Sequence, residues 1–354
     1  MPPATKYTLI ALLLIASSPL LAGINEANNA FNNGFYIDAY SEYRKLAGQG
    51  NRDAQFKLGD MYYEGHGLPK NYEKAATWFR KAAEQGHVIA QRKLGTACLL
   101  GQGVAQNDWE AFRWFSQAAA EGDSDAQFYL ATLYASGKGT QQDEQESVKW
   151  MTAAAEKGSV DAQFGLGYAY YHGEGVARDY HLAMAWINQA ATQDHLEAIK
   201  LIATMYSYGE GAPQNYNEAF DWYGKAADLD DAVAQNQLGE MYRDGLGVEK
   251  DYNKAMEYFR KAAAHGNAVA QLNIGLLYLS GLGVRVNDQE AAKWFKKSAA
   301  QELPLAQYAL GLAYASGLGV PYDFDRANSL LRKAEKQGIK DAAVQRRALS
   351  RQRR

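Results

Sequence analysis

The chain of 354 residues has one cysteine, Cys98, and only seven prolines. A single cysteine excludes a disulfide within the chain and excludes zinc sites built from two or more cysteines. Beyond the first 22 residues, no apolar run approaches the roughly 20 residues that a membrane-spanning helix needs. The period-two alternation of half-buried strands is missing as well. These absences indicate a helical protein that is stabilised by packing alone.

The net charge of −3 is distributed unevenly along the chain. All 40 acidic residues lie between Glu26 and Asp341, and 31 of the 37 basic residues share that span, so this body carries −9. A basic tail follows, with Arg346, Arg347, Arg351, Arg353 and Arg354. An acidic body lacks the basic stripe that nucleic-acid binding requires, so we expect no nucleic-acid partner. The tail is either a solvated end or an electrostatic handle for an anionic surface or an acidic partner.

Residues 1–22 have the pattern of a secretory signal peptide. Lys6 supplies the positive charge, residues 7–16 form the apolar region, and Ala22 is a candidate last residue before cleavage, although Leu20 at −3 is larger than usual. The alternative is an uncleaved membrane anchor, but the apolar run is short and Pro19 interrupts its end. We therefore expect a periplasmic or secreted protein with no stable membrane insertion after cleavage.

Glycine, at 33 residues, is abundant and reveals an internal repeat. Pairs of the form G-x-G recur every 36 residues without an insertion, beginning at Gly65/Gly67 and ending at Gly317/Gly319. They define eight units over residues 54–341. Residues 23–53 match the second half of a unit and are interpreted as a degenerate N-terminal repeat. Residues 342–354 form a basic C-terminal cap and tail, because Arg346 replaces the leucine of the earlier units.

Each unit predicts a helical hairpin. Apolar and small residues recur at helical spacing on both sides of the G-x-G, which predicts a helix A, a glycine stop and a helix B. One aromatic column follows the units in helix B and is interpreted as packing between neighbouring hairpins rather than as a ladder for stacking ligands; it comprises Trp78, Trp114, Trp150, Trp186, Trp222, Tyr258 and Trp294. A single hairpin cannot bury its apolar face, so the units are expected to stack into an α-solenoid.

The recurring A-Q-x-x-L-G-x-x-Y, G-x-G-V and W-F-x-x-A-A segments resemble the Sel1-like repeat (SLR) family, a relative of the tetratricopeptide repeat. The resemblance covers 288 residues and implies an all-α, right-handed solenoid whose A helices line the concave side. For exported members it implies regulators of envelope signalling, host-protein binders or immunity proteins against phospholipase toxins. Some exported members are β-lactamases with a cysteine pair in most repeats, and this chain has no such pair.

No catalytic, metal-binding or cofactor-binding residues are predicted. The six histidines show no metal-ligand spacing, and neither a nucleophile elbow nor a P-loop is present. Cys98 replaces a tyrosine that recurs in the other seven units. It is interpreted as a buried apolar residue, with an exposed reactive thiol as the alternative.

The variable positions of helix A predict a partner-binding surface. Through the tetratricopeptide resemblance they face the concave groove, and they form a middle aromatic cluster, a charged stretch and a leucine cluster. The selected residues are Phe128, Phe164, Tyr168, Tyr171, Lys200, Glu240, Arg243, Leu272, Leu276 and Leu279. Aromatic anchors beside charges are typical of protein-binding surfaces. The alternative is that these side chains pack locally against neighbouring units. The expected function is a non-catalytic scaffold that binds another protein, with a periplasmic immunity protein and a β-lactamase-like hydrolase as alternatives.

Overall fold

The computed structural model describes residues 18–352, which form nineteen helices and no strand. The helices fall into two compact units that divide between Arg178 and Asp179. The first unit contains α2 (Ser18–Asn32), α3 (Tyr36–Gly48), α4 (Arg52–Glu64), α5 (Tyr72–Glu84), α6 (Val88–Leu100), α7 (Asp108–Ala120), α8 (Ser124–Ser136), α9 (Glu144–Glu156) and α10 (Val160–His172). The second unit contains α11 (Tyr180–Ala191), α12 (Leu196–Tyr208), α13 (Tyr216–Asp228), α14 (Ala232–Asp244), α15 (Tyr252–Ala264), α16 (Ala268–Ser280), α17 (Asp288–Ala300), α18 (Pro304–Ser316), α19 (Phe324–Lys336) and α20 (Lys340–Gln352).

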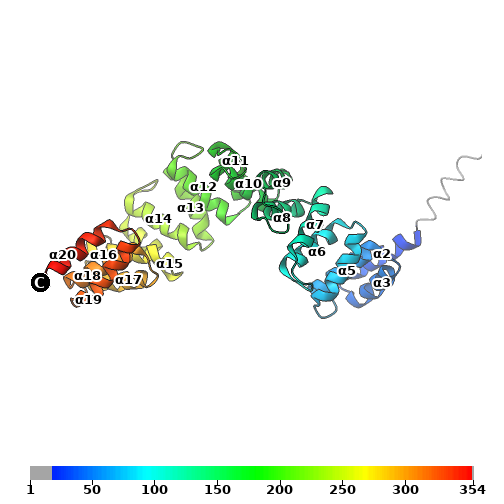
Figure 1. Ribbon diagram of the computed structural model, residues 1–354, viewed down its shortest axis with the longest axis horizontal. Helices are drawn as coiled ribbons and strands as arrows, with labels where there is room; N and C mark the ends of the chain where they lie inside the picture. Colours follow the sequence, from blue (N-terminus) through cyan, green and yellow to red (C-terminus); the bar gives the residue numbers. More distant parts are fainter. Residues whose placement is uncertain (1–17, 353–354) are drawn as a thin grey trace, which may run out of the picture. The chain divides into compact units, whose positions relative to one another are not determined.

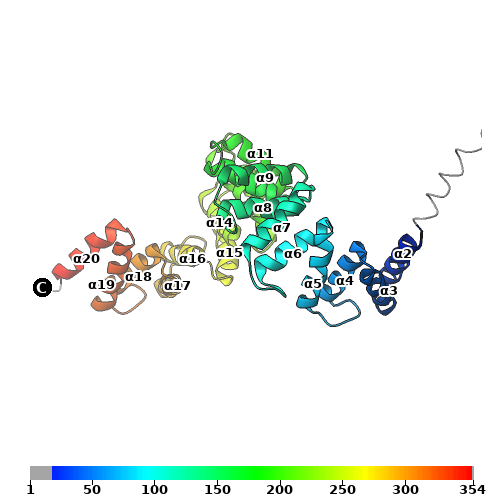
Figure 2. The ribbon, with the colours of Figure 1, turned by 45° about the vertical axis from the view of Figure 1, so that its right-hand side comes forward.

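Within each unit, every helix packs against the next helix along the chain (Figure 1). In the second unit, α17 to α20 follow one another in chain order (Figure 2). Helices of type A also touch the next A helix there, α14 against α16 and α18 against α20. The all-α prediction and the stacking of hairpins are confirmed. The handedness and the concave position of the A helices stay predictions.

Side chains and glycines fix the ends of the helices. Every B helix from α5 to α19 begins after an Asn or Asp whose side chain accepts a backbone N–H, as when Asn107 accepts from Glu110 at 3.0 Å. Every A helix from α4 to α18 ends at the first glycine of a pair, in the left-handed conformation with φ between 66° and 79°. The predicted glycine stop is therefore confirmed.

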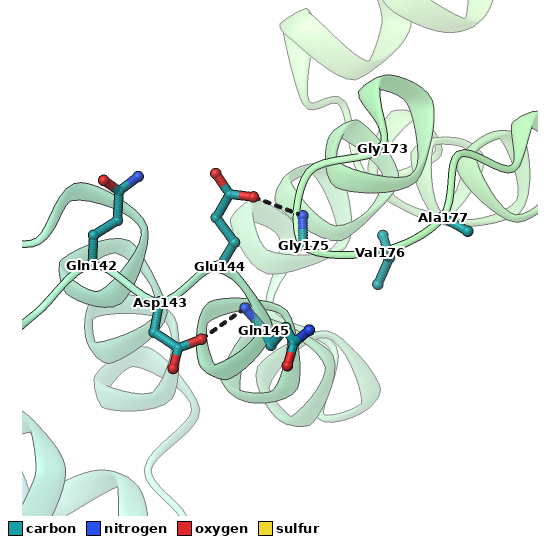
Figure 3. A pocket seen from close by; sticks show the side chains of 8 residues that line it. All are labelled: Gln142, Asp143, Glu144, Gln145, Gly173, Gly175, Val176 and Ala177. Atoms are coloured by element: carbon teal, nitrogen blue, oxygen red, sulfur yellow. Dashed lines mark hydrogen bonds between the residues drawn. The ribbon is translucent and has the colours of Figure 1, made fainter.

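The second glycine of each pair has a different role, because it rests on the start of the preceding B helix. Figure 3 shows the backbone N–H of Gly175 donating to Glu144 Oε2 at 3.1 Å. A Cβ on Gly175 would overlap the backbone carbonyl of Glu144, and a Cβ on Gly247 would overlap that of Tyr216. Only glycine permits this close approach, so the second glycine joins consecutive hairpins.

The glutamine of the A-Q segment also joins neighbouring hairpins. In α4, α6, α8 and α10 its side-chain amide is buried and donates to a carbonyl near the end of the preceding B helix. Gln55 donates to Ala47 at 3.2 Å and Gln127 donates to Ala119 at 3.1 Å. A buried polar group that makes such a bond fixes the register of the two helices.

The aromatic column selected from the sequence is not the innermost one. Trp114 and Trp222 are buried, whereas Trp78, Trp150, Trp186, Tyr258 and Trp294 are half-buried. Cations three residues later cover several of these rings, as when Lys297 Nζ lies 3.9 Å from the Trp294 ring centre. The next residue along is buried in every repeat except the one with the half-buried Met151, and Phe79, Phe115 and Phe259 in this column are at most 1 % exposed. A Cβ on Gly239 would lie 2.5 Å from the Phe259 ring, so the glycine of L-G makes room for this ring.

Both ends of the described chain carry partial repeats. Helices α2 and α3 form a hairpin with Ala27 and Tyr43 fully buried. At the other end, α20 occupies the place of a ninth helix A and packs on α19, where Arg346 Nε donates to Glu335 at 2.8 Å. The predicted leader lies mostly outside the described residues, and its positions 18–22 form the start of α2. Across residues 18–352, no helix is both long and apolar enough to cross a membrane.

Candidate functional site

The middle aromatic cluster lies on A helices α8 and α10 of the first unit. The rings of Phe164 and Tyr168 are 6.0 Å apart, and Tyr168 and Tyr171 lie 4.2 Å and 4.9 Å from the ring of His172. Tyr168 is 39 % exposed, and the other selected rings are half-buried. Phe128 contacts Tyr129 at 5.8 Å on α8. The structure thus brings two selected residues, Tyr168 and Tyr171, against His172, and Phe164 against Tyr168. The sequence analysis did not select His172, although it is four residues after Tyr168.

The first residue of the charged stretch, Lys200, lies in ion pairs with other parts of the second unit. Its Nζ lies 2.6 Å from Glu197 and 3.2 Å from Asp231, and the side chain is 20 % exposed. The pair with Asp231 joins α12 to the residue that caps α14. Lys200 therefore links neighbouring repeats, and its place in a partner-binding surface stays a prediction.

Glu240 and Arg243 meet at the buried side chain of Asn273. Arg243 Nη1 donates to Asn273 Oδ1 at 3.1 Å, and Asn273 Nδ2 donates to Glu240 at 3.1 Å and to Asn236 at 3.1 Å. Arg243 also pairs with Asp244 through two bonds, which lower the pKa of the Asp244 carboxyl. Because Asn273 is some 30 residues away in sequence, local spacing could not reveal this network.

The leucine cluster lines one side of an apolar pocket of about 350 Å³. Leu272, Leu276 and Leu279 from α16 face residues of α18, Phe295 of α17 and Leu318 of the following loop; those of α18 include Leu305, Tyr308 and Leu312. Leu272 is buried, while Leu276, Leu305 and Leu318 are 39 %, 53 % and 38 % exposed. The cluster therefore combines packing with an apolar surface open to solvent.

Two larger open pockets lie at the G-x-G loops and belong to the repeat itself. One, of about 610 Å³, lies between residues 142–145 and 173–177 (Figure 3), and the other, of about 600 Å³, lies between residues 286–289 and 317–321. Their lining positions differ by four repeat lengths. A hollow that recurs with the repeat is a product of its geometry and indicates no particular ligand.

The Sel1 repeat family matches the chain eight times in succession, at residues 52–87, 88–123, 124–159, 160–195, 196–231, 232–267, 268–303 and 304–339. The chain belongs to the Sel1 repeat family. The predicted family resemblance and the eight units are thereby confirmed.

Two solved bacterial structures resemble this Sel1 repeat protein over most of its length. One is a protective antigen present in uropathogenic Escherichia coli strains, with 35 % identity over 88 % of this chain and 67 % of that chain, and a TM-score of 0.80. The other is a Sel1 repeat protein from Oxalobacter formigenes, with 33 % identity, coverage of 87 % and 89 %, and a TM-score of 0.69. A Sel1-like repeat-containing protein of Schizosaccharomyces pombe is 59 % identical over 39 residues, and the match spans 6 % of that relative and 11 % of this chain.

The single thiol of this Sel1 repeat protein is buried between α6 and α7. Cys98 Sγ lies 3.4 Å from Glu110 Oε2, and Glu110 in turn accepts bonds from Arg80 at 3.0 Å and 3.4 Å. Burial raises the pKa of the Cys98 thiol to about 11. The interpretation of Cys98 as a buried residue is confirmed, because its exposed fraction is 0 %.

Two of the six histidines cap helices with their side chains. His87 and His195 cap α6 and α12, where Nδ1 of each ring accepts a backbone N–H at 3.2 Å. Among residues 18–352, no group of three His, Cys, Asp or Glu side chains is placed to hold a metal ion. The described residues form a Sel1 repeat scaffold fold, and the residues that differ most from repeat to repeat lie on helix surfaces.

Proposed function

We propose that this protein is a non-catalytic scaffold that binds a partner protein on the surface of its A helices. The observation that carries the proposal is the apolar pocket between α16 and α18. The repeat requires small and apolar residues where helices pack, yet Leu276 and Leu305 lie at variable positions and are 39 % and 53 % exposed. Apolar side chains that form an exposed, concave patch are typical of a binding surface.

The middle aromatic cluster is proposed as a second contact region on the first unit. Tyr168 is 39 % exposed and lies against Phe164 and His172. Tyrosine supplies a large apolar area and a polar tip at small entropic cost, which explains its frequency in interfaces. Lys200, Glu240 and Arg243 are proposed to flank the contact surface while they hold neighbouring repeats together.

The proposal places the protein in the periplasm or outside the cell after removal of residues 1–22. Cleavage after Ala22 keeps the buried residues of α2, Ile24 and Ala27, so the N-terminal hairpin retains its core. The description of the similar Escherichia coli protein as a protective antigen supports an exported location. Measurement of the N-terminal residue of the mature protein from periplasmic extract tests this part.

A pull-down from periplasmic extract tests the binding function. The bait is the mature protein, compared with the triple variant Phe164→Ala/Tyr168→Ala/Tyr171→Ala and with the variant Leu276→Gln. We expect a partner that binds stoichiometrically to the wild type and more weakly to at least one variant. Failure of purified wild type to bind any protein saturably would refute the scaffold function.

The identity of the partner decides between a general scaffold and the narrower immunity role. A bound phospholipase whose activity falls at a stoichiometric amount of the protein would assign the immunity role. Turnover of a β-lactam by pure protein would instead favour the hydrolase alternative and contradict the proposal.

A further inference from the structure

The A-type helices near the apolar pocket go from uncharged to basic toward the C-terminus. Helices α16 and α18 contain no charged residue, although the body of the chain is acidic. The next A-type helix, α20, contains Lys340, Arg346, Arg347 and Arg351 and a single acidic residue, Asp341. An uncharged apolar surface is thus followed by a basic one within the same unit.

The repeat register places these charges relative to the pocket. Leu279, Ala315 and Arg351 occupy one column of the repeat, at successive steps of 36 residues. Arg351 is therefore the residue of α20 that continues the column of the pocket-lining Leu279. The Arg351 side chain is exposed. Arg347, one turn earlier, continues the column of Gly275 and Gly311, which pack against their B helices in the earlier repeats.

Two of the other charges of α20 interact with α18 and α19. Arg346 pairs with Glu335. Asp341 lies at the opposite end of α20 from Arg351, and its charge acts on the hydroxyl of Tyr308, which lines the pocket. The cationic end of the surface is therefore formed by Arg351, and the apolar part by the pocket.

We infer that this surface of the second unit binds an acidic segment of the partner protein, which inserts a bulky apolar side chain between α16 and α18 and sets a carboxylate against Arg351. This inference rests on the proposed scaffold function and specifies the chemistry of the partner. The pocket volume of about 350 Å³ is sufficient for one large side chain, and Leu276, Leu305 and Leu318 form its accessible rim. The opposite charges would accelerate association and orient the segment.

A random-peptide library displayed on phage tests the inference with the intact protein as target. We expect the enriched peptides to combine leucine, phenylalanine or tryptophan with an excess of aspartate and glutamate. Enriched peptides are then titrated by fluorescence anisotropy against the protein and its variants. Leu276→Gln is expected to weaken binding about tenfold. Leu229→Gln, which changes a leucine that is 53 % exposed at the end of α13, is the matched control and should leave binding unchanged.

The contribution of charge has its own pair of variants. Arg351→Ser is expected to weaken binding several-fold and to flatten its dependence on salt. Lys296→Ser removes one exposed charge from α17 and should change neither. If Leu276→Gln disturbs the fold, as judged by circular dichroism, Leu305→Gln provides a second change at the rim of the pocket.

Three outcomes overturn the inference. The first is enrichment of neutral or basic peptides. The second is binding by Leu276→Gln and Leu305→Gln that equals that of the wild type. The third is occupation of the pocket by sodium decanoate while no peptide is enriched. The proposed function is judged separately. A partner captured from periplasmic extract that binds wild type and Leu276→Gln equally would leave the scaffold function standing and reject only this site.

Discussion

Replacing glycine by alanine can destabilise a fold in two ways, through strain at positive φ and through collision of the added Cβ with a neighbour. Two glycines of the second unit allow these effects to be measured apart. Gly247 and Gly266 both have positive φ, at 68° and 84°. A Cβ on Gly247 would overlap the carbonyl of Tyr216 and lie 2.8 Å from the nitrogen of Asn217, whereas a Cβ on Gly266 would meet nothing within 4 Å. Replacement of each by alanine therefore produces the same kind of strain but a different contact.

The expected magnitudes follow from these contacts. The left-handed conformation costs an alanine about 1–2 kcal/mol, and both variants incur this cost. Gly247→Ala must also displace the loop from the first turn of α13, which adds about 1–3 kcal/mol, as overpacking does in a core. The loss of freedom in the unfolded chain is the same for both substitutions, so it cancels in the comparison.

The residues at the position of Gly266 in other repeats support the smaller destabilisation expected for Gly266→Ala. Asp194, Asp230 and Glu302 occupy the same position in other repeats and adopt φ of 61°, 60° and 62°. A side chain is therefore compatible with this turn. In the column that contains Gly247, every repeat has glycine.

Urea unfolding followed by circular dichroism measures the difference. Because repeat arrays can unfold in stages, hydrogen exchange at the amides of Tyr216 and Asn217 provides the local measurement. We expect faster exchange at these amides in Gly247→Ala and little change in Gly266→Ala. Stabilities of the two variants that agree within about 0.5 kcal/mol, the ordinary scatter of surface substitutions, would refute the argument from close approach.

Three further predictions concern the buried columns and the ion pair beside the thiol. The rise of the Cys98 pKa from 9.0 to about 11 leaves about a hundredfold less thiolate in the folded protein. Ellman's reagent should therefore label the folded protein slowly and the urea-unfolded protein at once. Rapid labelling without urea would contradict the burial of Cys98. Arg80 lowers the pKa of Glu110 below its ordinary value of 4.5, so the pair stabilises the fold above that pH and the contribution is lost as the pH falls through the lowered value. Arg80→Gln should therefore reduce the melting temperature at neutral pH, and a reduction that does not shrink as the solution is acidified until Glu110 is protonated would count against the ion pair. Phe259→Ala should reduce the free energy of unfolding in urea by about 3–5 kcal/mol. Tyr258→Ala should reduce it clearly less, because Phe259 is fully buried and Tyr258 is half-buried. The reverse order would show that the wrong column was assigned to the core.

Much of the fold was predictable because its determinants are local. The glycine pairs mark the ends of the A helices, and the 36-residue spacing fixes the stacking of equivalent hairpins. Assignment of the core column was harder. Tyr258 and Phe259 are adjacent and both aromatic, and the difference in burial arises from Gly239, which receives the Phe259 ring. That contact joins residues 20 positions apart on different helices.

The candidate site was predictable only in part. Leu272, Leu276 and Leu279 stand out in sequence because three variable positions of one A helix are all leucine. The ring of Phe295 and the loop residue Leu318 complete the pocket from other elements, and periodicity does not reveal them. Glu240 and Arg243 were selected for a partner-binding surface, and their bonds with Asn273 of the next A helix were not predictable from local spacing.

The contact between each second glycine and the preceding B helix has a consequence for how the gene can change. Because the same junction recurs every 36 residues, excision or duplication of any 36-residue segment within the array rejoins equivalent surfaces. Unequal recombination between the repeats should therefore yield foldable proteins whose length differs by whole hairpins. Copy number then becomes a heritable variable that can alter the extent of a binding surface without inventing a new fold.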